Sequence, residues 1–104
     1  MLVKAIMRVR KIARKGNFRS RLLQVLIFIR VQAEYGSDKT ASGLELVCPM
    51  PQEVQRVSCS YEQEPKPANS MSWDWQEKSR RLVWKCKRFP GGSHRVLRVT
   101  RISK

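Results

Sequence analysis

The stretch VWKCKRFPGGSHRVLRV, residues 83–99, decides the fold that the sequence predicts. Apolar and basic side chains alternate, Phe-Pro-Gly-Gly interrupts them, and the alternation then resumes. A period of two residues is typical of a β-strand, whose successive side chains point to opposite faces. Pro90, Gly91 and Gly92 favour a turn, because glycine adopts positive φ at little cost. The stretch therefore predicts a β-hairpin, and a basic arm that binds nucleic acid is the alternative.

The alternation also assigns side chains to the two faces of this hairpin. Trp84 and Leu97 fall on an apolar face that we expect in the core, together with Leu82, Cys86 and Val99. Val83 falls on the outer face, and Phe89 stands among basic residues, where we expect it to be exposed. Five basic residues cluster around the hairpin and are candidate contacts to an anionic surface, either lipid headgroups or a nucleic-acid backbone: Lys85, Lys87, Arg88, Arg95 and Arg98. The alternative is a solvated positive face without a ligand.

Further segments with the same alternation occur along the chain and are separated by turn residues. Residues 21–35 are apolar on both faces, which is typical of a strand covered on each side. Trp75 lies in the segment 71–75, and we expect it to stack on Trp84 across adjacent antiparallel strands. The other expected segments are strands at 44–47 and 54–62, a strand or short helix at 1–10, and loops or turns at 13–20, 36–40, 49–51, 64–70 and 76–80. The arrangement predicts an all-β, antiparallel β-sandwich.

Length and charge restrict the classes of function. A chain of 104 residues is one domain or part of one, and its 41% hydrophobic content suits a folded protein. The net charge of +14 attracts polyanions such as nucleic acid, anionic lipid or acidic partners. Residues 1–33 and 78–104 hold nine and ten Lys and Arg with no acidic residue, whereas residues 34–77 hold all eight acidic residues. Strongly basic ends are also a feature of ribosomal and other nucleic-acid-binding proteins.

Patterns for catalysis, metal binding and membrane insertion are not found in the sequence. It contains no G-x-S-x-G, no phosphate-binding glycine loop and no paired carboxylates beside a base, so no catalytic residue, cofactor or small-molecule substrate is expected. Cys48, Cys59 and Cys86 form no C-x-x-C pair, and His94 is the one histidine, so no zinc site is expected. We expect buried, reduced thiols and a solvated His94. The longest apolar run, LLQVLIFI, is too short for a membrane helix, and neither a secretory signal nor a mitochondrial presequence is indicated.

Several segments together resemble the mu homology domain of the medium subunits of the clathrin-adaptor family. VWKCKRFPGG followed by HRVLRV is similar to the family's aromatic strand, its Pro/Gly turn and the returning strand. FIRVQAEYGSDKTASGLELVCPMP, residues 28–51, is similar to two strands joined by a polar turn and closed by P-x-P. Trp75 falls where the family has an aromatic residue before the hairpin tryptophan. The resemblance covers residues 24–100, and residues 1–23 match less well.

The resemblance implies an elongated, immunoglobulin-like β-sandwich, of which this chain would be the inserted subdomain. Residues 1–104 would be a single partial domain, with a basic N-terminal segment at 1–20 and the sandwich at 21–102. The strands that hold the family's pocket for tyrosine-based sorting signals do not match any segment here, so no residue of that pocket is assigned. Where the family has membrane-facing lysines, this chain has other residues at several positions: Phe28, Gln32 and Gly36.

The implied function is cargo and coat binding in vesicle-mediated intracellular protein transport, without catalysis. The implied partners are other adaptor-complex subunits and cargo sorting peptides, and the positive charge adds an anionic membrane surface. The implied location is cytoplasmic and peripheral, on coated vesicles of the Golgi, endosomes or plasma membrane. A different class is the alternative, a small basic nucleic-acid-binding or ribosomal-type protein.

Overall fold

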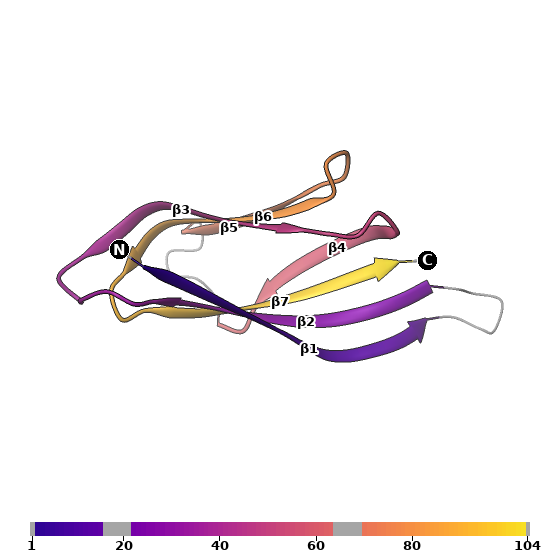
Figure 1. Ribbon diagram of the computed structural model, residues 1–104, viewed down its shortest axis with the longest axis horizontal. Coiled ribbons are helices and arrows are strands. Elements are labelled where there is room, and N and C mark those ends of the chain that lie inside the picture. The colour runs from indigo at the N-terminus through magenta and orange to yellow at the C-terminus, as the bar shows by residue number, and fades with distance from the viewer. Residues whose placement is uncertain (1, 16–21, 64–69, 104) are drawn as a thin grey trace.

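Seven β-strands make up the described part of the chain, which comprises residues 2–15, 22–63 and 70–103 of the computed structural model (Figure 1). They are β1 (Val3–Lys15), β2 (Leu22–Ala33), β3 (Thr40–Pro49), β4 (Val54–Tyr61), β5 (Met71–Gln76), β6 (Arg81–Pro90) and β7 (His94–Ser103). Every pair of neighbouring strands is antiparallel, and the strands form two facing sheets. The predicted all-β, antiparallel β-sandwich is therefore confirmed.

The strand boundaries follow the turn residues of the sequence. Pro49 is the last residue of β3, as expected for a residue that cannot donate to a ladder. Turns separate β2 from β3 and β5 from β6, as predicted. The segment 1–10 forms a strand rather than a helix, and β1 continues to Lys15, so the loop expected from residue 13 begins too early. The Pro-rich loop predicted at 64–70 lies outside the described residues except for Ser70.

The two sheets separate β6 from β7. Sheet A has the strand order β1-β2-β7-β4, and sheet B has the order β3-β6-β5, so the predicted β6–β7 hairpin is wrong (Figure 1). The predicted turn is present, since the Ser93 N–H donates to the Pro90 carbonyl at 3.1 Å and Gly92 has a φ of 77°. The turn carries the chain from one sheet to the other. Both apolar faces can then point into one interior, with Trp84 on one side and Leu97 on the other.

A second crossing between the sheets, residues 34–39, packs against this turn. The Gly91 N–H donates to the Lys39 carbonyl at 2.8 Å. A Cβ atom on Gly91 would lie 1.9 Å from the carbonyl oxygen of Gly36, so no side chain fits at position 91. Gly91 is therefore required because two backbone segments approach each other closely at this end of the sandwich.

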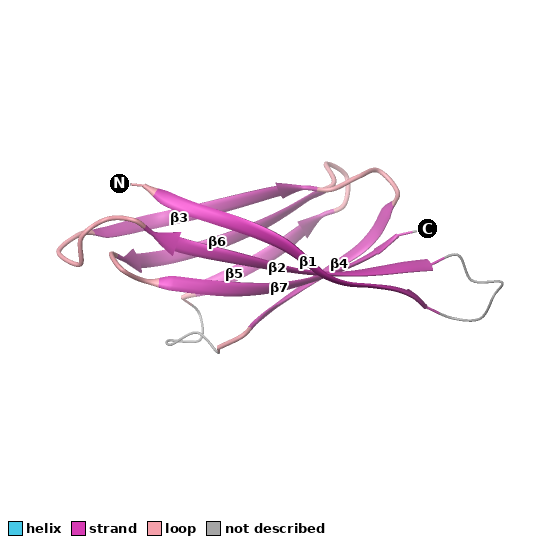
Figure 2. Ribbon diagram, turned by 60° about the horizontal axis from the view of Figure 1, so that its bottom comes forward, coloured by secondary structure: helices cyan, strands magenta, loops and turns pink. Residues whose placement is uncertain are grey.

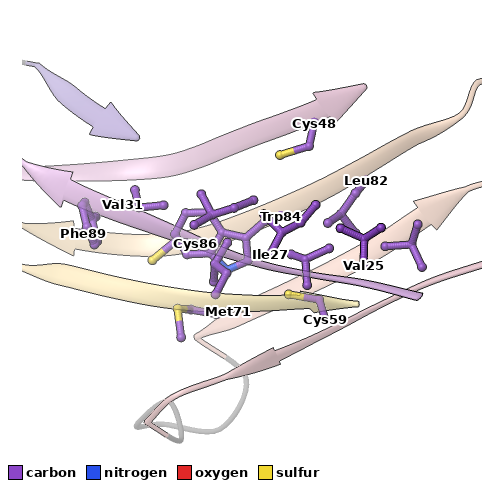
Figure 3. Close-up of a cluster of buried hydrophobic side chains, with 14 of the residues drawn as sticks. Val25, Ile27, Val31, Cys48, Cys59, Met71, Leu82, Trp84, Cys86 and Phe89 are labelled. Carbon is purple, nitrogen blue, oxygen red and sulfur yellow. The ribbon is translucent and has the colours of Figure 1, made fainter. Parts of the chain in front are cut away.

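Two aromatic rings of β6 occupy the interior between the sheets (Figure 3). Trp84 is 1% exposed and Phe89 is 0% exposed, and their ring centroids are 6.5 Å apart at an interplanar angle of 86°. This edge-to-face arrangement is favourable for aromatic pairs. Sheet A covers the rings with alternate residues of its inner strands, including Val25, Ile27, Ile29, Val31, Leu97 and Val99. The core positions predicted on β6 and β7 are confirmed: Leu82, Trp84, Cys86, Leu97 and Val99.

The expected exposure of Phe89 is wrong, because the alternation of β6 changes phase between Cys86 and Phe89. Trp84 and Cys86 are buried at even positions, whereas Phe89 is buried at an odd position. On the neighbouring β3, Gly43 lies opposite this part of β6 and has a φ of 67°. A residue with positive φ departs from the extended conformation, and strict alternation does not continue through such a distortion.

The predicted stacking of Trp75 on Trp84 has the wrong register. β5 pairs with β6 as expected, but Trp84 lies opposite Trp73, and Trp75 lies opposite Leu82. The ladder begins at the pair Gln76 and Arg81 on either side of the turn 77–80, and in this register Trp75 lies two residues away from the position opposite Trp84. Trp75 is partly buried against the core, whereas Trp73 is 38% exposed on the edge strand.

Substitution of either interior aromatic residue tests this core. We expect Trp84→Ala and Phe89→Ala each to lower the free energy of unfolding by about 3–5 kcal/mol, because each removes a fully enclosed ring. Trp73→Ala is the matched control and should cost less than about 1 kcal/mol. Urea unfolding followed by circular dichroism measures all three. Wild-type stability of Phe89→Ala would contradict the burial of this ring.

Candidate anion-binding surface

The outer face of sheet A carries arginines around Phe28. The registers of β1, β2 and β7 place Arg8, Phe28 and Arg98 directly opposite one another. Arg30 occupies the next outward position on β2, because the residues between these positions are buried. Residues paired across an antiparallel ladder share a face, so arginines from three strands meet on one side of the sheet. Figure 2 shows the three strands that carry this face running side by side.

The Phe28 ring lies close to two guanidinium groups. The Cζ atom of Arg10 is 5.7 Å from the ring centroid, and the Cζ atom of Arg98 is 5.8 Å from it. At these distances the quadrupole of the ring attracts the cations. The contact holds two positive charges near each other. Because these side chains are already partly ordered, an anionic ligand would lose less free energy in immobilising them on binding.

A hollow of about 550 Å³ opens beside this ring. Three arginines and one acidic residue contribute to its lining, which consists of Ile6, Arg8, Arg10, Phe28, Arg30, Glu62 and Val96. A phosphate or carboxylate group in the hollow would meet the guanidinium groups, which match such planar or tetrahedral anions as hydrogen-bond donors. The apolar lining would contact the remainder of the ligand. The hollow is therefore suited to a ligand that carries a negative charge on an apolar body.

The five sequence-predicted basic residues do not form one patch. Arg98 lies on the outer face of sheet A with the arginines described above. Lys85, Lys87 and Arg88 are exposed on β6, in the other sheet, and Arg95 is partly buried near the start of β7. Their separation follows from the crossing between β6 and β7. Contact of the individual residues with an anionic surface remains a prediction.

The outer face of sheet B differs from the sequence expectation at Val83. This residue is 3% exposed, because it lies on the central strand opposite Val47 and Asp74. Lys85 shares the face and lies opposite Glu45, which offsets part of its charge. Sheet B therefore presents a more mixed surface than sheet A.

Sequence reasoning missed Arg8, Arg10 and Arg30 as members of one surface. Part of the signal was available within each strand, since Phe28 and Arg30 alternate with buried isoleucines in β2. Basic residues also recur at outward positions of β1. The sequence does not give the register that places β1 and β7 on either side of β2, and this register brings the arginines together.

The three cysteines are free and buried, as the sequence predicts. Burial raises the pKa of Cys48 and of Cys86 above the ordinary value of a thiol. For Cys59, burial and then the neighbouring Cys48 raise the pKa from 9.0 to about 11. The thiolate is the nucleophilic form, so thiols that stay protonated are weak nucleophiles. These cysteines therefore contribute to the core rather than to a reactive site.

Other chemistry is not concentrated elsewhere in the described ranges. His94 is exposed at the start of β7. Among residues 2–15, 22–63 and 70–103, no group of three or more His, Cys, Asp and Glu is placed to hold a metal ion. The same part of the chain forms no helix long and apolar enough to cross a membrane.

Comparison with known proteins finds a relative that matches part of the chain. No protein-family model matches the chain. The chain is 32% identical over 77 residues to a curated protein of Arabidopsis thaliana, the AP-4 complex subunit mu. The aligned region covers 74% of this chain and 16% of that relative, so the chain spans a small part of the relative's length.

The raised pKa of Cys59 predicts a loss of stability at high pH. In the unfolded chain this thiol ionises near pH 9, whereas in the folded chain it stays protonated until about pH 11. The folded state thus binds more protons in this range, and the free energy of unfolding should fall as pH rises from about 9 to about 11. Urea unfolding at pH 8, 9 and 10.5 measures this free energy. The Cys59→Ala variant is the control for lysines and tyrosines that also titrate, and an equal slope in both proteins would contradict the assignment.

Proposed function

We propose that the chain is a binding module without catalytic activity, related to the medium subunits of adaptor complexes, and that it acts in vesicle-mediated intracellular protein transport. The observation that carries the proposal is its 32% identity to an AP-4 complex subunit mu in an alignment that covers 74% of the chain. The antiparallel β-sandwich supports it, because the mu homology domain that the sequence resembles is also built from such sandwiches.

Within this proposal the chain corresponds to the inserted subdomain of a mu homology domain. Its partners would be other adaptor-complex subunits and cargo sorting peptides, and its location would be cytoplasmic and peripheral on coated vesicles. The pairing of β1 with β2 along twelve residue pairs supports a role for the N-terminal segment within the same sandwich. The activity of the whole relative is part of the proposal, since the alignment covers 16% of it.

We also propose that the outer face of sheet A contacts an anionic membrane surface. Arg8, Arg10, Arg30 and Arg98 concentrate positive charge there, and one acidic residue, Glu62, lines the hollow. Anionic headgroups attract each such residue by about 1 kcal/mol near a membrane surface. A sheet face can lie flat against a membrane, so all four arginines would reach headgroups together.

A chimeric subunit tests the adaptor role. The aligned segment of an AP-4 complex subunit mu is replaced by the corresponding segment of this chain, and incorporation into the complex is measured by affinity purification from cells. We expect the chimera to assemble and to associate with membranes like the parent subunit, because the β-sandwich would replace its counterpart. The same chimera with Trp84→Ala is the control, since loss of the core should abolish assembly. A stably folded chimera that fails to enter the complex would contradict the proposal.

Vesicle binding tests the anionic surface. The double variant Arg30→Glu, Arg98→Glu should bind vesicles of phosphatidylcholine and phosphatidylserine about tenfold or more weakly than wild type in co-sedimentation assays. The double variant Lys78→Glu, Arg81→Glu carries the same change in net charge at the β5–β6 turn and should bind like wild type. If both double variants weaken vesicle binding equally, the net charge of the protein alone attracts the vesicles, and the proposed surface on sheet A is contradicted. Binding of single-stranded RNA that survives about 0.15 M salt would favour the nucleic-acid alternative.

A further inference from the structure

Strand β1 leaves part of its inner face uncovered. Within the described residues, sheet A has four strands and sheet B has three, and β1 is the terminal strand of the larger sheet. Met7 and Val9 lie opposite the buried residues Ile29 and Ile27 and so belong to the inner face. They are nevertheless 56% and 54% exposed. Apolar side chains on the core side of a sheet are normally covered, so this edge of the sandwich has room for one more strand.

The hydrogen bonds of the sheet show which backbone groups of β1 face its free edge. The Glu34 N–H donates to the Leu2 carbonyl at 2.9 Å, and these residues are in register with the β1–β2 pairs. Bonded and non-bonded pairs alternate in an antiparallel ladder, so the even-numbered residues of β1 are bonded to β2. The N–H and C=O groups of Ala5, Met7 and Val9 therefore point away from β2. The ladder continues regularly until the shift between Val9 and Lys11.

The side chains beside this free edge have a definite chemical pattern. The inner positions Ala5, Met7 and Val9 are apolar. The outer positions are basic at Lys4, Arg8 and Arg10 and apolar at Ile6. A strand added to β1 would place successive side chains alternately beside these two sets. Its inner side chains would have to be apolar and its outer side chains negatively charged.

We propose that β1 binds an extended peptide segment of a partner protein, in which acidic and apolar residues alternate. The peptide pairs its backbone with the free groups of Ala5, Met7 and Val9 and becomes the fifth strand of sheet A, next to β1. Its apolar side chains cover Met7 and Val9, and its carboxylates face Arg8 and Arg10. This mode of recognition obtains affinity from backbone hydrogen bonds and specificity from the alternate side chains. The backbone pairing uses the strand edge, whereas Arg8 and Arg10 are shared with the anion-binding face of sheet A.

Charge complementarity favours this occupant over a second copy of the chain. If β1 paired with β1 of another molecule, Lys4, Arg8 and Arg10 of one copy would lie beside the same residues of the other. Like charges across a ladder are destabilising, and positive charges at an edge are a common protection against self-association. An acidic strand turns the same charges into attractions.

Amide hydrogen exchange tests the proposal directly. The probe is a synthetic peptide in which Glu alternates with Val. Its length of about eight residues approximately matches the regular part of β1. Addition of this peptide should slow exchange of the Ala5, Met7 and Val9 amides, measured by NMR, and leave the Ile6 and Arg8 amides, already bonded to β2, nearly unchanged. A peptide in which Lys replaces Glu should give no protection. No protection with the acidic peptide, or equal protection with both peptides, would overturn the proposal.

Two pairs of variants separate the edge from the surface charge. Met7→Lys with Val9→Lys removes the apolar inner face at exposed positions, and we expect it to weaken binding of the acidic peptide about tenfold despite the added positive charge. The double variant Lys78→Gln, Arg81→Gln changes two basic residues far from β1 and is the control, which should bind like wild type. Unchanged tryptophan fluorescence, to which the buried Trp84 contributes, would verify that each variant folds. If the Met7→Lys, Val9→Lys variant binds the acidic peptide more tightly than wild type, charge attraction alone explains the binding and the proposal is overturned. The proposal is also overturned if, without peptide, the amides of Ala5, Met7 and Val9 become protected as the protein concentration rises, because a second copy would then occupy the edge.

Discussion

The enclosure of Trp84 and Phe89 between the sheets is the constraint on which the rest of this structure depends. Both rings belong to β6, the central strand of sheet B, and meet edge to face. Alternate residues of β2 and β7, the central strands of sheet A, cover them. Because the central strands of both sheets supply most of the enclosure, the edge strands are free to differ. β5 leaves Trp73 partly open, and β1 extends beyond the covered region.

The same enclosure determines the path of the chain. β6 and β7 each have one apolar face, and both faces must meet the same interior. In a hairpin the two strands would lie in one sheet, and the rings would lack a cover. The turn at residues 90–93 instead leads from sheet B to sheet A, and the preceding crossing at 34–39 leads in the opposite direction. The two crossings touch where Gly91 meets Gly36, so a position without a side chain follows from the topology.

The sequence predicts what depends on neighbouring residues and fails where distant segments decide. Alternation and turn residues predict the strands and the inward direction of Trp84 and Leu97, because both follow from local backbone geometry. They do not predict the burial of Phe89, which depends on a distortion beside Gly43, or the pairing of Trp84 with Trp73. The candidate surface shows the same limit. Arg98 was identified from its own strand, whereas Arg8, Arg10 and Arg30 join it only through the sheet register.

The unequal sheets connect the stability of the fold with its capacity to bind. A fourth strand in sheet A adds a ladder with β2, but sheet B is too narrow to cover the added strand. The uncovered inner face and the free backbone of β1 would favour aggregation if the strand were apolar on both faces. Arginines on its outer face oppose pairing between copies and, with Phe28 and Arg98, concentrate positive charge beside the edge. A negatively charged partner relieves the repulsion that a second copy increases, so the residues that keep the edge open also select what can close it.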